Sequence, residues 1–111
     1  MSDVMITGAA RTAMGGFQGA FSDVTAAELG GAAIKAALDQ ATPSHVDELL
    51  MGCVLPAGQG QAPARQAGFA AGLGEDVPAT TLNKMCGSGM KAAMMAFDAI
   101  ALGRADTIVS G

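Results

Sequence analysis

Short apolar runs rich in β-branched residues alternate along this chain with longer segments whose apolar residues recur at helical spacing. Four runs predict strands at residues 3–7, 48–55, 77–82 and 106–110, because β-branched side chains and bounding turn residues are typical of strands. The second run opens at Val46, and the strand is expected to begin near Glu48.

Three segments predict helices between these strands. Thr25 is a plausible N-cap with Glu28 three residues later, which is the spacing of a capping box, and an apolar face follows. Residues 64–73 form the second helix, which Gly74 should end. The third helix begins after Cys86, with apolar positions at Met90, Ala93, Met94, Phe97, Ile100 and Ala101, and Gly103 should end it.

The alternating order of elements predicts an α/β fold. Strands that alternate with helices form a mainly parallel sheet with right-handed crossovers and helices on both faces. The four methionines Met85, Met90, Met94 and Met95 are expected to fill the interface between helix and sheet, or alternatively to line a thioester pocket.

Composition narrows the class of protein. Half of the 111 residues are hydrophobic and 14% are charged, so intrinsic disorder is excluded. The net charge of −4 and six scattered basic residues argue against nucleic acid or an anionic membrane as partner. No apolar segment is long enough to span a bilayer and no export signal is visible, so a soluble cytoplasmic protein is expected.

Cys86 is the residue that best fits a nucleophile. It lies where a predicted strand becomes a helix, and unpaired N–H groups and the dipole at a helix N-terminus favour an anion. Gly87 and Gly89 flank Ser88 and leave room for a sharp turn and for a ligand near the backbone. The alternative is a small buried thiol, as free cysteines usually are.

Other candidate groups have simpler explanations. Cys53 is expected in the core of the second strand, and His45, the one histidine, is expected in a solvated loop unless folding brings it to Cys86. Two reduced thiols are expected, with a Cys53–Cys86 disulfide as the alternative. No paired Cys or His spacing predicts a metal site.

Four segments together resemble the N-terminal part of the thiolases, the acetyl-CoA acetyltransferases and 3-ketoacyl-CoA thiolases. The third segment contains Asn-Lys-Met-Cys-Gly-Ser-Gly-Met and is the most specific, whereas the first has Ala13 where a proline is common. The segments are residues 11–17, 58–67, 83–92 and 105–111.

The resemblance implies a cysteine acyl-enzyme. Cys86 would accept an acyl group from an acyl-CoA, with the backbone of Cys86, Gly87, Ser88 and Gly89 as the turn that forms the oxyanion site. Two acetyl-CoA molecules would be condensed to acetoacetyl-CoA, or a 3-ketoacyl-CoA would be cleaved as in fatty acid metabolism. Coenzyme A is then substrate or product, and no permanently bound cofactor is implied.

The resemblance also implies a larger protein. Residues 1–111 would be the first half of the N-terminal domain of a five-layer fold, whose sheet a later strand completes, without the loop domain or the C-terminal domain. The activating histidine, second cysteine and asparagine-histidine segment of the family are expected beyond Gly111, so the isolated chain should be inactive. Residues 79–84 would pair with a second subunit in a dimer or tetramer.

The sequence leaves two alternative functions open. One is a non-catalytic domain that keeps the thiolase fold for interaction. The other is a condensing enzyme of the ketoacyl synthase type, which shares the layered fold and a cysteine nucleophile.

Overall fold

A three-stranded parallel sheet forms the centre of the molecule. A computed structural model describes residues 3–111. Strand β1 (Glu48–Gly52) lies between β2 (Ala79–Leu82) and β3 (Ile108–Ser110). Leu50 is in register with Thr80 on one side and with Ser110 on the other. The predicted α/β fold with a parallel sheet is confirmed.

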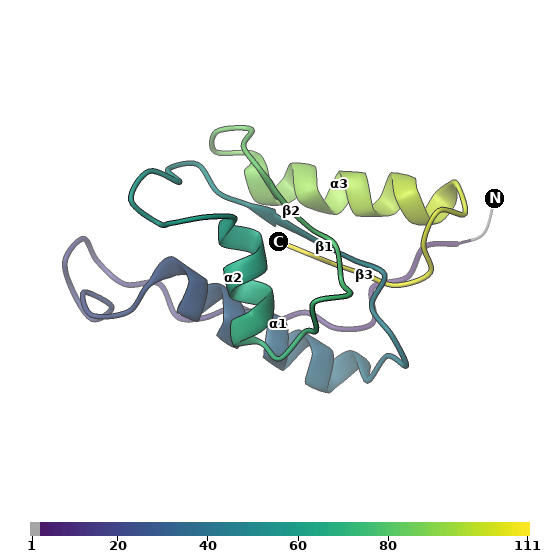
Figure 1. Cartoon of the computed structure of the whole chain (residues 1–111), viewed down its shortest axis with the longest axis horizontal. Helices are drawn as coiled ribbons and strands as arrows, with labels where there is room; N and C mark the ends of the chain where they lie inside the picture. Colours follow the sequence, from purple (N-terminus) through teal and green to yellow (C-terminus); the bar gives the residue numbers. More distant parts are fainter. Residues whose placement is uncertain (1–2) are drawn as a thin grey trace.

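Helices cover both faces of this sheet (Figure 1). Helices α1 (Ala26–Ala41) and α2 (Pro63–Ala70) lie on one face, and α3 (Ser88–Ala101) lies on the other. Consecutive strand residues point to opposite faces, and both Leu49 and Leu50 are buried, with 1% and 2% of their surface exposed. Leu49 packs into the core under α1 and α2, and Leu50 packs into the core under α3.

The first helix begins as its sequence predicts. Thr25 Oγ1 accepts a hydrogen bond from the Glu28 N–H at 3.1 Å, and the Glu28 carboxylate accepts one from the Thr25 N–H at 2.7 Å. These two bonds form the capping box. The bond from the Thr25 N–H, followed by the Thr25 hydroxyl, lowers the pKa of Glu28, since donors to the carboxylate favour its charged form. The helix ends at Ala41, where Thr42 adopts a left-handed conformation.

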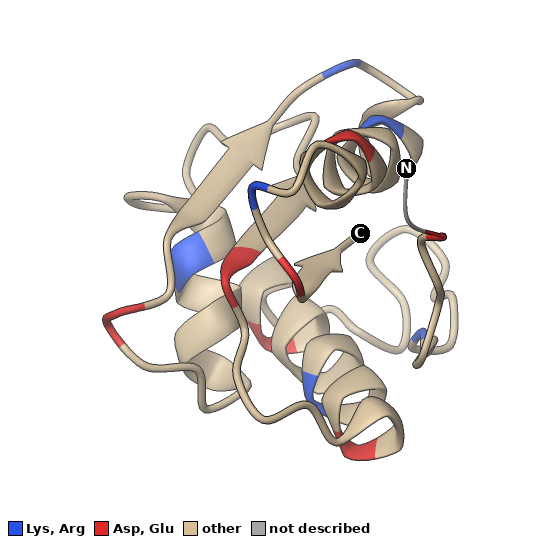
Figure 2. Ribbon diagram, turned by 90° about the vertical axis from the view of Figure 1, so that its right-hand side faces the viewer, with Lys and Arg blue, Asp and Glu red and all other residues tan. Residues whose placement is uncertain are grey.

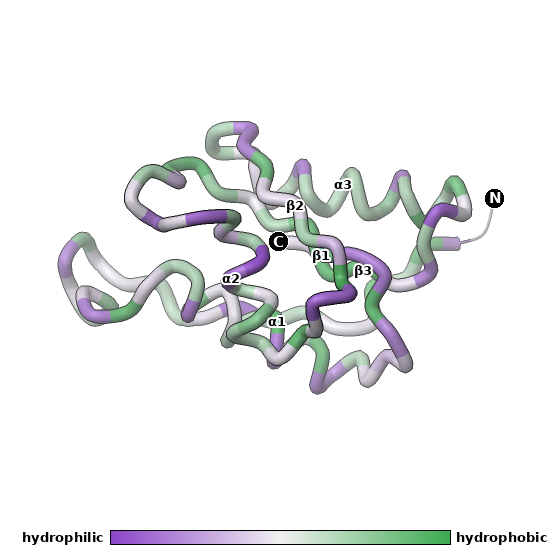
Figure 3. Tube along the Cα trace, in the orientation of Figure 1, coloured by the Kyte–Doolittle hydropathy of each residue, from purple (hydrophilic) through white to green (hydrophobic). Residues whose placement is uncertain are grey.

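Helix α3 packs on the sheet through small residues, contrary to the expected methionine interface. Ser88, Ala92 and Ala96 are its buried positions. Met90 and Met94 are 74% and 52% exposed, and Met95 is the methionine that packs against Leu50 and its neighbours. Small side chains let the helix axis approach the sheet closely, and Met90 and Met94 point outward. Figure 3 shows this mixture of apolar and polar positions along α3.

Residues 3–7 do not form the predicted strand. Their backbone belongs to no sheet, and the chain instead contacts α1, where the Ala9 N–H donates to Gln40 Oε1 at 3.1 Å. A cavity of about 540 Å³ is lined by residues 4–10, by faces of α1 and α3, and by β3. A strand needs a hydrogen-bonding neighbour about 4.8 Å away, and the cavity occupies that space.

Element boundaries differ from the predicted ones at four places. Strand β1 ends at Gly52, so residues 53–55 follow it, and β2 is confined to residues 79–82. Helix α2 ends at Ala70, before the predicted Leu73, because Gly72 takes a left-handed φ of 90°. Strand β3 starts at Ile108 rather than Asp106.

Lysine and arginine residues are spread over separate elements of the fold (Figure 2). Among residues 3–111, no helix combines the length and the apolar character that crossing a membrane requires.

Candidate active site around Cys86

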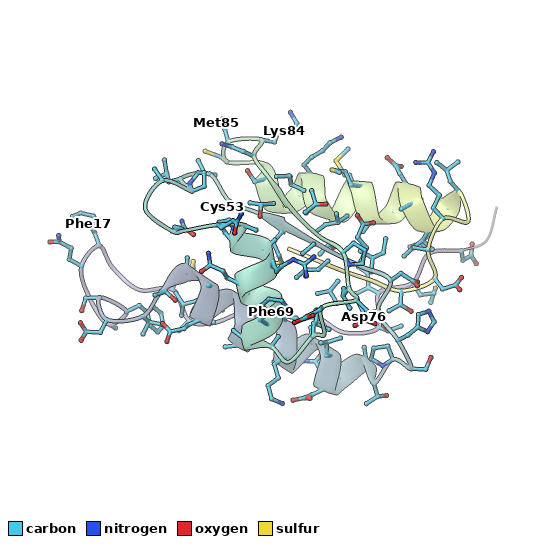
Figure 4. The ribbon with its side chains drawn as sticks, in the orientation of Figure 1. Phe17, Cys53, Phe69, Asp76, Lys84 and Met85 are labelled. Carbon is cyan, nitrogen blue, oxygen red and sulfur yellow. The ribbon has the colours of Figure 1, made fainter. Side chains whose placement is uncertain are left out.

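The cysteine turn, residues 83–88, joins β2 to α3. Cys86 is exposed and comes directly before Gly87, the N-cap residue of α3. Because the turn follows a strand of a parallel sheet, it lies at the carboxyl end of that sheet, where α/β folds commonly place their sites. Lys84 and Met85 project from the tip of this turn (Figure 4).

The sharp bend of the cysteine turn is made at Met85, not at the glycines that predicted it. Met85 has a φ of 48°, in the left-handed region that a residue with a Cβ rarely adopts. Gly87 has a φ of −93°, and Gly89 is likewise outside the left-handed region. The glycines therefore supply space, while the unusual backbone conformation lies next to Cys86.

Two of the four backbone donors in the predicted oxyanion turn are already used. The Gly87 N–H donates to the Lys84 carbonyl at 3.0 Å, and the Ser88 N–H donates to the Met85 carbonyl at 3.1 Å. For the N–H groups of Cys86 and Gly89, no acceptor is found within residues 3–111. Helix α3 also has no side chain capping its N-terminus. An anion near Cys86 would therefore meet unpaired donors.

Gly52, at the end of β1, lets α3 begin close to the sheet. A Cβ at Gly52 would lie 2.7 Å from the Ser88 backbone carbon and 2.8 Å from the Gly89 nitrogen. No local sequence pattern indicates this role of Gly52, because it depends on two segments that are far apart along the chain.

The apolar neighbours of Cys53 predicted that it lies inside a strand, but it lies outside β1. It follows the last residue of β1, is partly buried, and donates its N–H to the Leu82 carbonyl at 2.8 Å. Cys53 and Cys86 are both free thiols. Cys53 therefore lies beside the end of β2, on the chain segment adjacent to the cysteine turn.

His45 lies at the opposite end of the sheet from Cys86. It precedes β1, whereas the cysteine turn follows β2, and the five residues of β1 span about 16 Å at roughly 3.3 Å per residue. The fold therefore does not bring His45 to Cys86, and His45 is an exposed loop residue as expected.

His45 belongs to a cluster with Asp47 and Asp106. One potential ligand atom from each lies within 4.8 Å of the others. Asp47 Oδ2, however, accepts backbone N–H bonds from Asp106 at 2.8 Å and Thr107 at 2.9 Å. These bonds, that of Thr107 first, lower the pKa of Asp47, and nearby His45 contributes in the same direction. The cluster therefore ties the entry of β1 to the entry of β3.

Comparison with known proteins identifies the family. The family model described as "Thiolase, N-terminal domain" matches residues 4–111. The chain belongs to the thiolase family. This thiolase chain is 54% identical to an acetyl-CoA acetyltransferase of Cupriavidus necator and 51% identical to one of Pseudomonas aeruginosa, in each case over the whole chain. It is 52% identical to "Acetyl-CoA acetyltransferase 2" of Arabidopsis thaliana over 98% of the chain.

The matched region is a part of each relative. The thiolase chain spans 29% of the Cupriavidus and Pseudomonas proteins and 28% of the Arabidopsis protein. The match to the thiolase family model favours a thiolase over a ketoacyl synthase.

Proposed function

We propose that this chain carries the acyl-accepting cysteine, Cys86, of an acyltransferase that acts on CoA thioesters. The exposed thiol on a strand-to-helix turn with unpaired donors supports this proposal most directly. The names of the relatives, acetyl-CoA acetyltransferases, support acetyl-CoA as a substrate.

The proposed reaction has two steps. The Cys86 thiolate attacks the carbonyl carbon of an acyl-CoA, the carbonyl electron pair moves onto oxygen, and the collapse of this intermediate expels the CoA thiolate, which is then protonated. In synthesis, the acyl group is next transferred from Cys86 to the α-carbon of a second acetyl-CoA, which has lost a proton, and the Cys86 thiolate leaves. In cleavage, the Cys86 thiolate instead attacks the 3-keto carbon of a 3-ketoacyl-CoA and expels the enolate of acetyl-CoA, which is protonated. The acyl group then passes from Cys86 to the thiol of CoA. Covalent capture divides one difficult step into two easier ones.

The N–H groups of Cys86 and Gly89 are the proposed donors to the oxyanion in this chain. Both lack an acceptor within the described residues, whereas those of Gly87 and Ser88 hold the turn together. Donors fixed in place before the charge develops stabilise a transition state with little reorganisation.

The groups that activate Cys86 and move the α-proton are proposed to lie in the remainder of a longer protein. His45 is at the far end of the sheet and Cys53 matches no motif of the family, so neither takes those roles. The 111-residue chain alone is accordingly expected to show no thiolysis of acetoacetyl-CoA, and measurable turnover by it would contradict this expectation.

Acyl transfer can be tested by trapping the acyl-enzyme in the full-length protein. After brief mixing with acetyl-CoA and acid quench, mass spectrometry should find one acetyl group on the peptide with Cys86. Cys86→Ser should abolish turnover, and Cys53→Ser is the matched control that should retain it. An active Cys86→Ser protein, or acetylation of Cys53 instead, would exclude the proposed nucleophile. An unlabelled, inactive protein would favour the alternative of a non-catalytic interaction domain.

We also propose that β2 pairs with its copy in a second subunit. It is an edge strand in the order β2-β1-β3, and an unpaired edge is a template for another strand. Leu49 and Cys53 donate to the carbonyls of Pro78 and Leu82, so in a parallel ladder the N–H of Ala79 points away from β1. Ala79→Pro should therefore lower the oligomeric state measured by light scattering, and an unchanged state would exclude this edge.

A reducing compartment such as the cytoplasm is the proposed location, since both thiols are free.

A further inference from the structure

The cysteine turn holds a strained residue directly before its nucleophile. Met85 is left-handed at a φ of 48°, although a Cβ makes this conformation unfavourable. Such a residue persists where its surroundings over-determine it. The direction of the next residue, Cys86, depends on the Met85 backbone, so whatever holds Met85 also aims the thiol.

Ser88 holds both peptide groups that flank this bend. Its Oγ accepts a hydrogen bond from the Lys84 N–H at 2.9 Å and donates one to the Met85 carbonyl at 2.6 Å. Ser88 is 4% exposed and is the buried polar residue of the described core. Because water has little access to this hydroxyl, its loss would leave the Lys84 N–H without this partner.

Asn83 holds the same bend from the solvent side. Its Oδ1 accepts a hydrogen bond from the Met85 N–H at 2.9 Å, and its Nδ2 donates to the Val54 carbonyl at 3.2 Å. The second bond anchors the turn to the segment that follows β1. Met85 is therefore bonded through its N–H to Asn83 and through its carbonyl to Ser88.

We propose that Ser88 is a positioning residue for Cys86 and that Asn83 assists it. Neither side chain touches the substrate in this role. They keep Met85 left-handed, and Cys86 is thereby held at the uncapped N-terminus of α3. The role of Ser88 as part of the nucleophile's site rests on the proposed function of Cys86.

The test compares the alkylation rate of Cys86 by iodoacetamide in two full-length variants. Ser88→Ala removes the hydrogen bonds of the Ser88 hydroxyl to the Lys84 N–H and the Met85 carbonyl. Thr81→Val is the matched control, because it removes a hydroxyl that accepts one backbone N–H, from Ala64 at 2.9 Å, but does not bond to the cysteine turn. Peptide mapping reports Cys86 and Cys53 separately.

Ser88→Ala should slow the alkylation of Cys86 about two- to fivefold. This change corresponds to the roughly 0.3–1 kcal/mol that a charge gains at a helix N-terminus. Greater exposure cannot mask this loss, since Cys86 is already exposed. Thr81→Val should leave the alkylation rate of Cys86 unchanged, even if both variants unfold at a lower urea concentration than the unchanged protein. An unchanged rate in Ser88→Ala, or an equal fall in Thr81→Val, would overturn the proposal.

Asn83→Ala keeps the proposal testable if Ser88→Ala does not fold. Asn83 is exposed, so this variant loses the bond to Met85 without opening the core. A slower alkylation of Cys86 supports the positioning role, and an alkylation rate equal to that of the unchanged protein contradicts it.

Turnover separates this proposal from the function on which it rests. In an active full-length enzyme, Ser88→Ala should lower kcat with little change in KM, because substrate contacts are kept. If Cys86→Ser retains activity, the proposed function fails, while the alkylation rates still decide whether Ser88 positions Cys86.

Discussion

At the level of single residues, Asp47 and Gly52 govern how distant segments meet. Asp47 joins the start of β1 to the start of β3 through two backbone N–H bonds to one oxygen. Gly52 joins the end of β1 to the start of α3 by having no side chain. Each of these contacts can be removed by one substitution.

Asp47 should make the stability of the fold depend on pH. Its pKa is lowered in the folded chain, so the unfolded chain binds a proton more readily and acid favours unfolding. The stabilisation is present at neutral pH and is lost as the pH falls below the ordinary range of an aspartate. Asp47→Asn should flatten the change in urea midpoint between about pH 6 and about pH 3.

Asp39→Asn is the control for this measurement. Asp39 forms an exposed ion pair with Lys35 at 3.2 Å, and such surface pairs contribute little to stability. Its removal should leave the pH dependence unchanged. If the urea midpoints of the Asp47 and Asp39 variants depend on pH in the same way, the hydrogen bonds to the Asp47 carboxylate do not stabilise the fold.

Gly52→Ala should destabilise the protein by about 1–3 kcal/mol, the range for inserting a group into a packed site. Its Cβ would lie 2.7 Å from Ser88 backbone, which cannot rotate away as a side chain can. Gly16→Ala is the control, since a Cβ there would meet nothing within 4 Å. Urea unfolding measures both, and equal stability of the two variants would contradict the close approach.

At the scale of elements, the helices begin in different ways. Helix α1 has a complete capping box, whereas α3 has no side-chain cap and begins beside Cys86. A capped terminus uses its N–H groups for stability. At the uncapped terminus of α3, the N–H groups of Cys86 and Gly89 have no acceptor within residues 3–111, and they are the donors that we propose for the oxyanion.

Thr25→Ala should lower the free energy of unfolding by about 0.5–2 kcal/mol, because the N-cap bond to Glu28 is lost. Ser22→Ala is a suitable control, since this exposed serine makes no side-chain hydrogen bond within the described part of the chain. Urea unfolding followed by circular dichroism measures both variants. An equal change in the two would mean that the cap is not what stabilises α1.

At the scale of the whole molecule, α3 presents an apolar stripe to solvent. Met90, Met94 and Phe97 recur one helical turn apart and are each at least half exposed. Their spacing indicates one continuous face rather than scattered residues. Such a face marks a surface that binds another protein segment or associates with itself.

The 111-residue chain should therefore associate through this stripe. Replacing Met90, Met94 and Phe97 together by glutamine should lower the mass measured by light scattering, with helix content unchanged in circular dichroism. Phe17→Gln is the control, because Phe17 is 95% exposed in a loop away from α3. An equal effect of both changes would show that total exposed apolar area, not the stripe, drives association.

Patterns in the amino-acid sequence are sufficient to predict part of this structure. The capping box predicts the start of α1 because its residues are close together in the chain. The order of strand and helix patterns predicts the parallel α/β sheet, and four segments in order indicate the family. Tertiary structure decided the rest. Residues 3–7 lack a neighbouring strand, α3 turns Met90 and Met94 outward, and Met85 rather than a glycine is left-handed. Those outcomes depend on contacts between distant segments, such as Gly52 with Ser88 and Asn83 with Val54, which no local pattern encodes.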